Sequence, residues 1–329
     1  MTMTLTAPVV LDETTSDTTV QMTDDALRGT YRRSLLRKKP DLVLGHNGKA
    51  FDANVTVKRP KRNIILSVIM IPLAAIAALP FYYLVVNTLK TQHEVTQSPL
   101  GLPSGIFLDN YLNVFQQTRV VPAFFNTVYV TALSIGLMLL IGAMAAFAVV
   151  VGGRKVATFM GFVLAIAFLI PPQTTLIHQF RMFANVGLTD SLNGLIVFYT
   201  VGSIFCYFLI VGYMKSIPKE LFEAARVDGA GTLRIFFSVV MPLIRPILVT
   251  AGVFQTMWVW NDFLMPSIWI SSANNHTLVL QVTTAIGQFA TNWPMLLTLT
   301  VIVLIPIVVF FIFAQKHIVN GLLAGAVKG

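Results

Sequence analysis

Residues 123–151 read AFFNTVYVTALSIGLMLLIGAMAAFAVVV and contain no Asp, Glu, Lys or Arg. The run is longer than the roughly 20 apolar residues that an α-helix needs to cross the hydrocarbon core of a bilayer. An α-helix pairs every backbone N–H and C=O within its own segment, and an unpaired group in hydrocarbon is costly. The run therefore predicts a membrane-spanning helix.

The whole chain has the composition of a polytopic membrane protein. Of its 329 residues, 55% are hydrophobic and 11% are charged, against roughly 25% charged in a soluble domain. The expected fold class is all-α, with six transmembrane helices at Ile64–Val86, Ala123–Val151, Val156–Leu176, Leu192–Met214, Ile244–Ile270 and Trp293–Ala314. Kinks or helix ends are expected at six of the 16 prolines, at positions 72, 80, 171, 172, 294 and 306.

The distribution of Lys and Arg favours one orientation. On one side they occupy the N-terminal tail, residues 154–155, the loop 215–245 and the C-terminus, whereas the other side has only Lys90, Arg119 and Arg181. Because positively charged loops stay in the cytoplasm, both termini are expected there. Three loops would then face outward: Lys90–Val121, Gln173–Ser191 and Ser271–Asn292.

Outside the spans, the net charge of +9 is unevenly placed. Eleven of the 23 Lys and Arg residues precede residue 63, and most of the rest lie at the ends of apolar runs. This pattern favours contact with anionic lipid over binding of nucleic acid. Residues 1–57 are expected to form a largely disordered cytoplasmic tail, and residues 58–329 the transmembrane domain. A short helix at Asp25–Arg37 on the inner leaflet and a fully solvated tail are both compatible with the sequence.

A charged segment separates the fourth and fifth predicted spans. Residues 223–246 read EAARVDGAGTLRIFFSVVMPLIRP. Ser216 is expected to cap a helix with Pro218 in its first turn, and Gly229 and Gly231 to break it with φ values that other residues resist. A second short helix is expected from Thr232, with an apolar stripe at helical spacing: Leu233, Phe236, Phe237 and Val240. The stripe fits lipid head groups or a groove on a soluble partner equally well.

The same segment resembles the EAA loop of bacterial ABC importer permeases. The matching residues are Glu223, Ala224, Ala225, Asp228, Gly229, Val239, Met241 and Pro242. The stretches WNDF at 260–263 and NGLLAGAVKG at 320–329 resemble the smaller, six-span membrane subunit of carbohydrate importers of the maltose type. The resemblance covers roughly residues 64–329 and leaves the tail 1–57 unexplained.

This resemblance implies a complex of several subunits in the bacterial cytoplasmic membrane. In the family, two homologous permeases sit over two cytoplasmic ATPase subunits, which bind ATP and Mg²⁺, and an extracytoplasmic solute-binding protein delivers the sugar. The loop 216–242 would dock on an ATPase through Glu223, Ala224, Ala225, Asp228, Gly229, Leu233, Phe236, Phe237 and Pro242. The C-terminal tail 315–329, with Asn320, Gly321 and Lys328, either reaches the ATPases or is frayed.

Polar and aromatic residues in the fifth predicted span indicate a substrate path. Gln255, Trp258, Asn261 and Asp262 offer the hydroxyl partners and aromatic surface that a carbohydrate needs. However, Trp also belongs at membrane interfaces, and Asp262 in a purely structural role would cap or tie helices. The outward loop Ser271–Asn292 either enters the solute-binding protein's cleft or is a solvated hairpin.

The predicted function is that of a non-catalytic permease subunit for a carbohydrate, expected to be an oligosaccharide. The chain lacks the motifs G-x-x-x-x-G-K-[ST], H-E-x-x-H and G-x-S-x-G, and its one cysteine, Cys206, is expected to be a small buried residue. No cofactor or metal is expected in the chain itself. One alternative is an ABC permease for another solute. A second is an ion-coupled carrier, which predicts buried charges in several spans where only Asp262 qualifies. A third alternative, nucleic-acid binding through the basic tail, would not explain the EAA-like loop.

Overall fold

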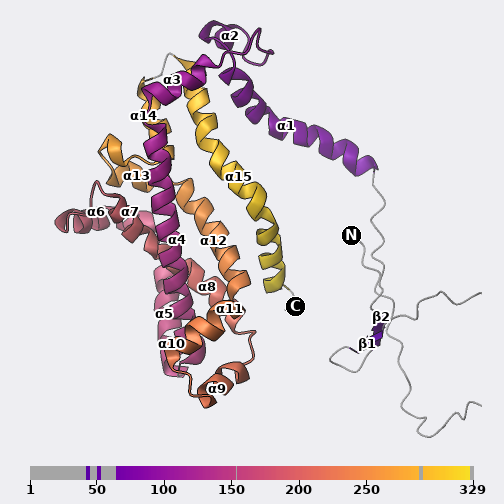
Figure 1. Cartoon of the computed structure of the whole chain (residues 1–329), viewed down its shortest axis with the longest axis vertical. Helices are drawn as coiled ribbons and strands as arrows, with labels where there is room; N and C mark the ends of the chain where they lie inside the picture. The colour runs from indigo at the N-terminus through magenta and orange to yellow at the C-terminus, as the bar shows by residue number, and fades with distance from the viewer. Residues whose placement is uncertain (1–41, 45–49, 53–63, 153, 289–291, 327–329) are drawn as a thin grey trace, which may run out of the picture. The chain divides into compact units, whose positions relative to one another are not determined.

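Most of the residues that the structure describes are helical (Figure 1). The computed structural model covers residues 42–44, 50–52, 64–152, 154–288 and 292–326. Contacts divide the chain into two units, residues 1–78 and 79–329. In the first, β1 (Leu42–Leu44) pairs antiparallel with β2 (Ala50–Asp52). This hairpin is an exception to the all-α prediction, and the rest of the tail 1–57, including the helix expected at 25–37, lies outside the described residues.

Among the described residues, four helical segments are long and apolar enough to cross a membrane. They are α1 (Ile64–Thr88), α4 (Val120–Val151), the run Leu192–Met214 and α15 (Trp293–Ala326). The run Leu192–Met214 comprises α7 (Leu192–Tyr199), the 3₁₀ turn η3 (Thr200–Gly202) and α8 (Ser203–Met214). These segments agree with four of the six predicted spans.

Two further segments are bent, which gives up to six spans if each bent pair is one crossing. The first joins α5 (Arg154–Leu169) through η2 (Pro172–Thr175) to α6 (Leu176–Asn185), at an angle of 79°. Its break lies at the prolines 171 and 172, as the sequence predicts. The second joins α10 (Thr232–Arg234), η4 (Ile235–Val240) and α11 (Met241–Leu243) to α12 (Arg245–Trp260), at 76°.

The fifth predicted span, Ile244–Ile270, is wrong at its C-terminal end. Helix α12 ends at Trp260, and a separate short helix, α13 (Leu264–Trp269), follows. Pro266 has no N–H to donate to the carbonyl of Asp262, so the helix of α12 does not continue through it.

The predicted outward loops contain helices of their own. The first holds α2 (Gln92–Gln97) and α3 (Asp109–Gln117), and the third holds η5 (Ala273–Asn275) and α14 (Leu278–Gln288). Leu278 and Leu280 of α14 are buried, and Leu278 belongs to an apolar cluster with Leu299 of α15 and Val120 of α4. Of the two alternatives for Ser271–Asn292, the solvated hairpin is therefore wrong, because this segment buries apolar side chains against two long helices.

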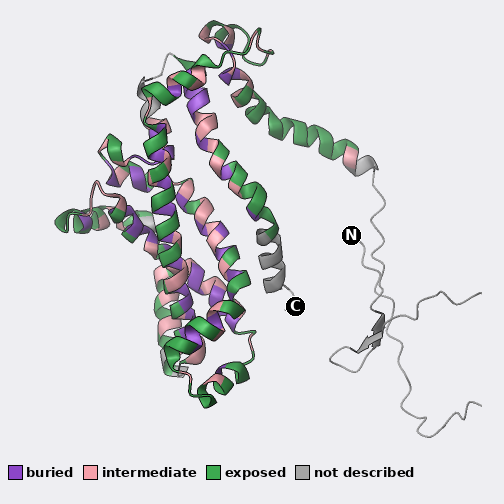
Figure 2. Ribbon diagram, in the orientation of Figure 1, coloured by how far each residue is buried: buried purple, intermediate pink, exposed green. Residues whose placement is uncertain are grey.

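The main core of the second unit forms where α4 packs along α8, with α7 and α12 beside them (Figure 2). At this contact, a Cβ on Gly142 would lie 2.7 Å from the Cβ of Cys206. Only a glycine lets the two helices approach so closely, as is common where membrane helices cross. Cys206 is fully buried there, which confirms its prediction as a small core residue.

Candidate functional site

The loop between α8 and α12 begins with the helix α9 (Glu220–Val227). Lys219 occupies the N-cap position and makes no side-chain capping bond. The hydroxyl of Ser216 donates instead to the carbonyl of Tyr213, at 2.6 Å, in the last turn of α8. The prediction that Ser216 caps the helix is therefore wrong, because its hydroxyl already binds the preceding turn.

Gly229 ends α9 with a φ of +77°. Its N–H donates to the carbonyl of Arg226, and the N–H of Ala230 donates to the carbonyl of Ala225, each at 3.0 Å. These two bonds form a Schellman motif, in which a left-handed residue follows the helix end. The bend predicted at Gly229 is confirmed. Gly231 has a φ of −67°, which any residue adopts, so the special backbone predicted there is wrong.

The second helix of the loop contains a π-helical stretch, η4. Its hydrogen bonds run from i to i+5, so side chains no longer repeat at the α-helical spacing used for the prediction. Phe236 and Val240 are buried, whereas Leu233 and Phe237 are 69% and 55% exposed. The prediction of one apolar stripe is therefore wrong, because the four residues divide between the core and the surface.

An exposed surface remains on this loop, made of apolar and acidic side chains. Glu223, Ala224, Asp228, Gly229 and Pro242 are exposed, and Ala225 is half-buried. We use the name loop surface for the exposed residues Leu221, Glu223, Ala224, Val227, Leu233 and Phe237. Val227 is 87% exposed, which is unusual for a side chain of its type. The loop surface therefore has the composition of a binding site for another protein.

The other side of the loop is anchored to α4. Phe222 is buried, and the ring of Phe236 packs on that of Phe147 with centroids 5.4 Å apart. The guanidinium Nη2 of Arg226 donates to the carbonyl of Val151, the last residue of α4, at 3.3 Å. Phe236 thus supports the loop from within rather than forming part of its exposed surface.

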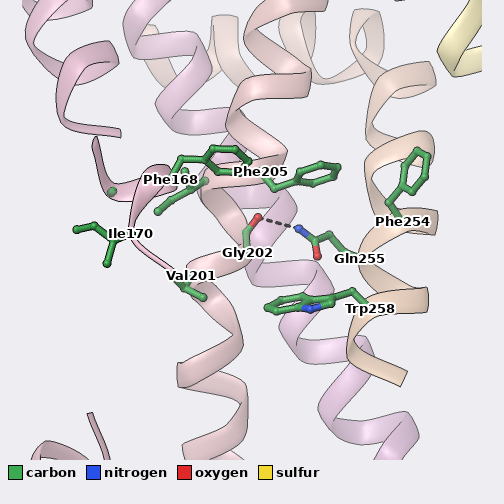
Figure 3. A pocket seen from close by; sticks show the side chains of 10 residues that line it. Phe168, Ile170, Val201, Gly202, Phe205, Phe254, Gln255 and Trp258 are labelled. Carbon is green, nitrogen blue, oxygen red and sulfur yellow. Dashed lines mark hydrogen bonds between the residues drawn. The ribbon is translucent and has the colours of Figure 1, made fainter. Parts of the chain in front are cut away.

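A cavity of about 380 Å³ opens beside the predicted substrate residues (Figure 3). Gln255 is buried in its wall, and its Nε2 donates to the carbonyl of Gly202 at 2.9 Å. Trp258 is 40% exposed and contributes its ring to the same wall. The remaining lining is apolar and comes from Ala167, Phe168, Ile170, Val201, Ile204, Phe205 and Phe254.

Asn261 and Asp262 do not line this cavity. The hydroxyl of Tyr199 donates to Oδ2 of Asp262 at 2.7 Å, and the N–H of Leu264 donates to Oδ1 at 3.0 Å. Asn261 is exposed and donates to the carbonyl of Met257. Of the two interpretations of Asp262, the geometry supports the structural one, because its carboxylate ties α7 to the start of α13.

Asp190, in the connection between α6 and α7, was not among the predicted site residues. Its Oδ1 accepts the N–H groups of Ser271 and Ser272, at 3.0 and 2.8 Å, and its Oδ2 contacts the hydroxyl of Ser272. Led by Ser272, these bonds lower the pKa of Asp190 below its ordinary value. Asp190 has a φ of 51°, which Asp tolerates better than most residues. No motif in the sequence marks this contact between two loops.

The predicted C-terminal tail is mostly a continuation of α15. The helix runs to Ala326, so Asn320 and Gly321 are helical, and Lys328 lies outside the described residues.

Comparison with known proteins identifies the family. The model of the family described as "binding-protein-dependent transport system inner membrane component" matches residues 138–323, more than half of the chain and the whole loop 216–242. The chain belongs to this family. The importer-permease family predicted from the EAA-like residues is thereby confirmed, and the chain is a multi-pass inner membrane component of a transport system.

Relatives match the chain over most of its length. A probable starch degradation products transport system permease protein of Thermoanaerobacterium thermosulfurigenes is 33% identical, over 80% of this chain and 96% of its own length. A melibiose/raffinose/stachyose import permease protein of Bacillus subtilis is 31% identical, over 78% and 95%. A chain from the crystal structure of a bacterial ABC transporter involved in the import of the acidic polysaccharide alginate has a TM-score of 0.69 at 23% identity. It covers 77% of this chain and 95% of its own, and it shows that the fold is shared.

Proposed function

We propose that the chain is a permease subunit of an ATP-driven importer and forms half of the translocation path for a carbohydrate. Its relatives bear the names of transporters for starch degradation products and for melibiose, raffinose and stachyose. Oligosaccharides are therefore the substrate class. The observation that carries the proposal is the loop surface, which exposes Leu233, Phe237 and Glu223 on a segment inside the family match.

In this proposal the loop surface docks on a cytoplasmic ATPase subunit. Leu233 and Phe237 supply apolar area, Glu223 a polar contact, and Ala224 allows close approach. Two ATPase subunits bind ATP and Mg²⁺, and a second homologous permease completes the path. An extracytoplasmic solute-binding protein delivers the sugar. Both termini then lie in the cytoplasm, and the C-terminal helix approaches the ATPases.

Motion of the ATPase would reach the spans through two contacts of the loop. One is the packing of Phe236 on Phe147, and the other is the hydrogen bond from Arg226 to the carbonyl of Val151. Both join the loop to the same end of α4. A displacement of the loop therefore acts directly on this helix.

The cavity beside Gln255 and Trp258 is the proposed part of the substrate path in this subunit. A sugar ring has an apolar face that stacks on an exposed aromatic ring such as that of Trp258. The amide of Gln255 is held by Gly202 and presents a polar group among apolar neighbours. In this proposal, Asp262 positions α13 rather than touching the sugar.

The coupling part of the proposal is tested by copurification from the host membrane. The wild-type chain should recover an ATPase and a second permease, and both Glu223→Lys and Gly229→Pro should lose the ATPase. Asp109→Lys, a charge reversal on α3 outside the loop, and Gly231→Ala serve as controls and should retain it. Unchanged ATPase recovery with both loop variants would contradict the proposal.

The substrate part has a separate test. Candidate oligosaccharides, presented with the solute-binding protein, should stimulate ATP hydrolysis by the reconstituted complex. Stimulation by another solute and by no carbohydrate would refute the substrate class while leaving the coupling intact. Uptake driven by an ion gradient without ATP would instead support the carrier alternative.

A further inference from the structure

The segment after α2 folds back along the helix that precedes it. The carbonyl of Ser98 accepts the ammonium of Lys90 at 2.8 Å, that of Pro99 accepts the amide of Asn87 at 2.9 Å, and that of Leu100 accepts the hydroxyl of Tyr82 at 2.9 Å. As the chain runs from residue 98 to residue 100, its hydrogen-bond partners therefore lie progressively earlier in the sequence, from Lys90 back to Tyr82. By Phe107 the chain has returned, because the N–H of Phe107 donates to the carbonyl of Leu89 at 3.2 Å.

If α1 crosses the membrane, these partners give the depth of the loop in it. The apolar span in α1 ends at Thr88. With a rise of 1.5 Å per residue, Tyr82 lies about 10 Å back along the helix from Leu89. Leu100 is bonded to Tyr82 and so lies at a level within the span. Tyr side chains also favour the boundary between hydrocarbon and head groups, which places the loop at that boundary.

Large apolar side chains project from this loop and from α3. We define the apolar belt as six residues, with their exposed fractions: Leu100 62%, Leu102 81%, Ile106 75%, Leu108 58%, Leu112 58% and Phe115 52%. The last three follow the i, i+4, i+7 spacing of one helix face. On another face of α3, the amide of Asn110 donates to the carbonyls of Thr88 and Lys90. Helix α3 is therefore fixed to the end of α1 with its apolar face outward.

Several hydrogen bonds hold the loop in this conformation. Lys90 is only 1% exposed, and its ammonium binds two loop carbonyls. A Cβ on Gly101 would meet the hydroxyl of Ser98, which would have to rotate away. Glu94 accepts the N–H of Ser104 at 3.0 Å and forms a capping box with Thr91. Polar contacts within the same segment thus hold the loop in the conformation that exposes the apolar belt.

We propose that the apolar belt inserts into the leaflet that adjoins this end of α1, so that residues 98–115 anchor the chain in the interface. The occupant is the upper acyl-chain and glycerol region of phospholipid. The depth of Leu100 beside Tyr82 argues for lipid over a protein that docks from the aqueous side. None of the six belt side chains is charged, and amphipathic helices with one apolar face bind in this region. The inference depends on α1 crossing the membrane and not on the identity of the transported solute.

Collision accessibility of a nitroxide spin label tests this inference. The label is attached to Leu102→Cys or Ile106→Cys, each in a Cys206→Ala background, because Cys206 is the only native cysteine. The matched control is Gln97→Cys, an exposed polar position at the end of α2. The full-length chain, with any subunits that copurify, is reconstituted in vesicles of phosphatidylethanolamine and phosphatidylglycerol.

At both belt positions, molecular oxygen should collide with the label more often than a water-soluble nickel chelate, and at position 97 the order should be reversed. Easy access of the nickel chelate to both belt positions would mean that the loop lies in water, and the inference would fall. Exclusion of both reagents would mean that protein covers the belt, which also overturns it. Both belt positions are far more than half exposed, so labelling them does not disturb the core.

Discussion

Replacement of Gly229 by Ala tests whether a left-handed backbone holds the end of α9. Gly229 has a φ of +77°, and a Cβ there would meet no atom within 4 Å. The change therefore adds backbone strain without a clash. Strain of this kind costs about 1–2 kcal/mol, and the smaller conformational freedom of unfolded Ala offsets about 0.4–1 kcal/mol. The net local loss is roughly 1 kcal/mol, which corresponds to about a 5-fold increase in opening of the turn.

Amide hydrogen exchange measures this opening at the N–H groups of residues 229 and 230, which close the Schellman motif. The control is Gly231→Ala, because Gly231 has an ordinary φ of −67° and also has no atom near its Cβ position. There the strain is absent, so exchange should stay the same or slow slightly. Equal acceleration in both variants, or none in Gly229→Ala, would refute the reasoning. The same pair should differ in ATPase recovery if the turn presents the loop surface.

Three further predictions concern single side chains. Hydrogen bonds from Ser104 and Thr91 lower the pKa of Glu94 from its usual 4.5 to about 2. The stabilisation that Glu94 gives to α2 is therefore complete above pH 4.5 and is lost as the pH falls toward 2. Glu94→Gln should abolish this pH dependence, measured as amide exchange of residues 91–104. Tyr199→Phe removes a bond to Asp262 and should cost about 1–3 kcal/mol in thermal unfolding in detergent, so an unchanged melting temperature would count against the helix tie. Phe236→Ala should lower the free energy of unfolding by about 3–5 kcal/mol because the ring is buried. Phe237→Ala should change it by only about 0.5 kcal/mol and should instead reduce ATPase recovery. The opposite pattern would contradict the assignment of Phe236 to the core and Phe237 to the surface.

Much of the fold follows from the sequence because a segment that crosses a membrane must be apolar and must pair its backbone polar groups within itself. The run Ala123–Val151 contains no charged side chain and is long enough to span the bilayer, so this helix was predicted to within three residues of its observed bounds. The break at Pro171 was also predictable, because proline removes a donor. The end of α12 was not predicted, because residues 244–270 form one mostly apolar run although Asn261, Asp262 and Pro266 interrupt it.

The candidate site shows the same division. The helix–glycine–helix form of the loop was predicted from Gly229, whose positive φ is a local property. Which side chains of the second helix are buried was not predicted, because the π-helical turn changes the spacing between side chains on one face. That turn accompanies the packing of Phe236 on Phe147, which the sequence does not report. Likewise, the partners of Asp190 lie more than 80 residues away in the chain, and no local pattern reports them.

Helix α4 also touches the opposite side of the chain from the loop at residues 216–242. Near its start, the amide of Asn126 donates to the carbonyls of Asn274 and His276, and the hydroxyl of Thr127 accepts the N–H of Leu278. At its end, Val151 accepts Arg226. About 38 Å of unbroken helix joins the two ends. Because a continuous helix of this length tilts as one body, a displacement of the loop 216–242 at one end of α4 would also move residues 274–278 at the other end.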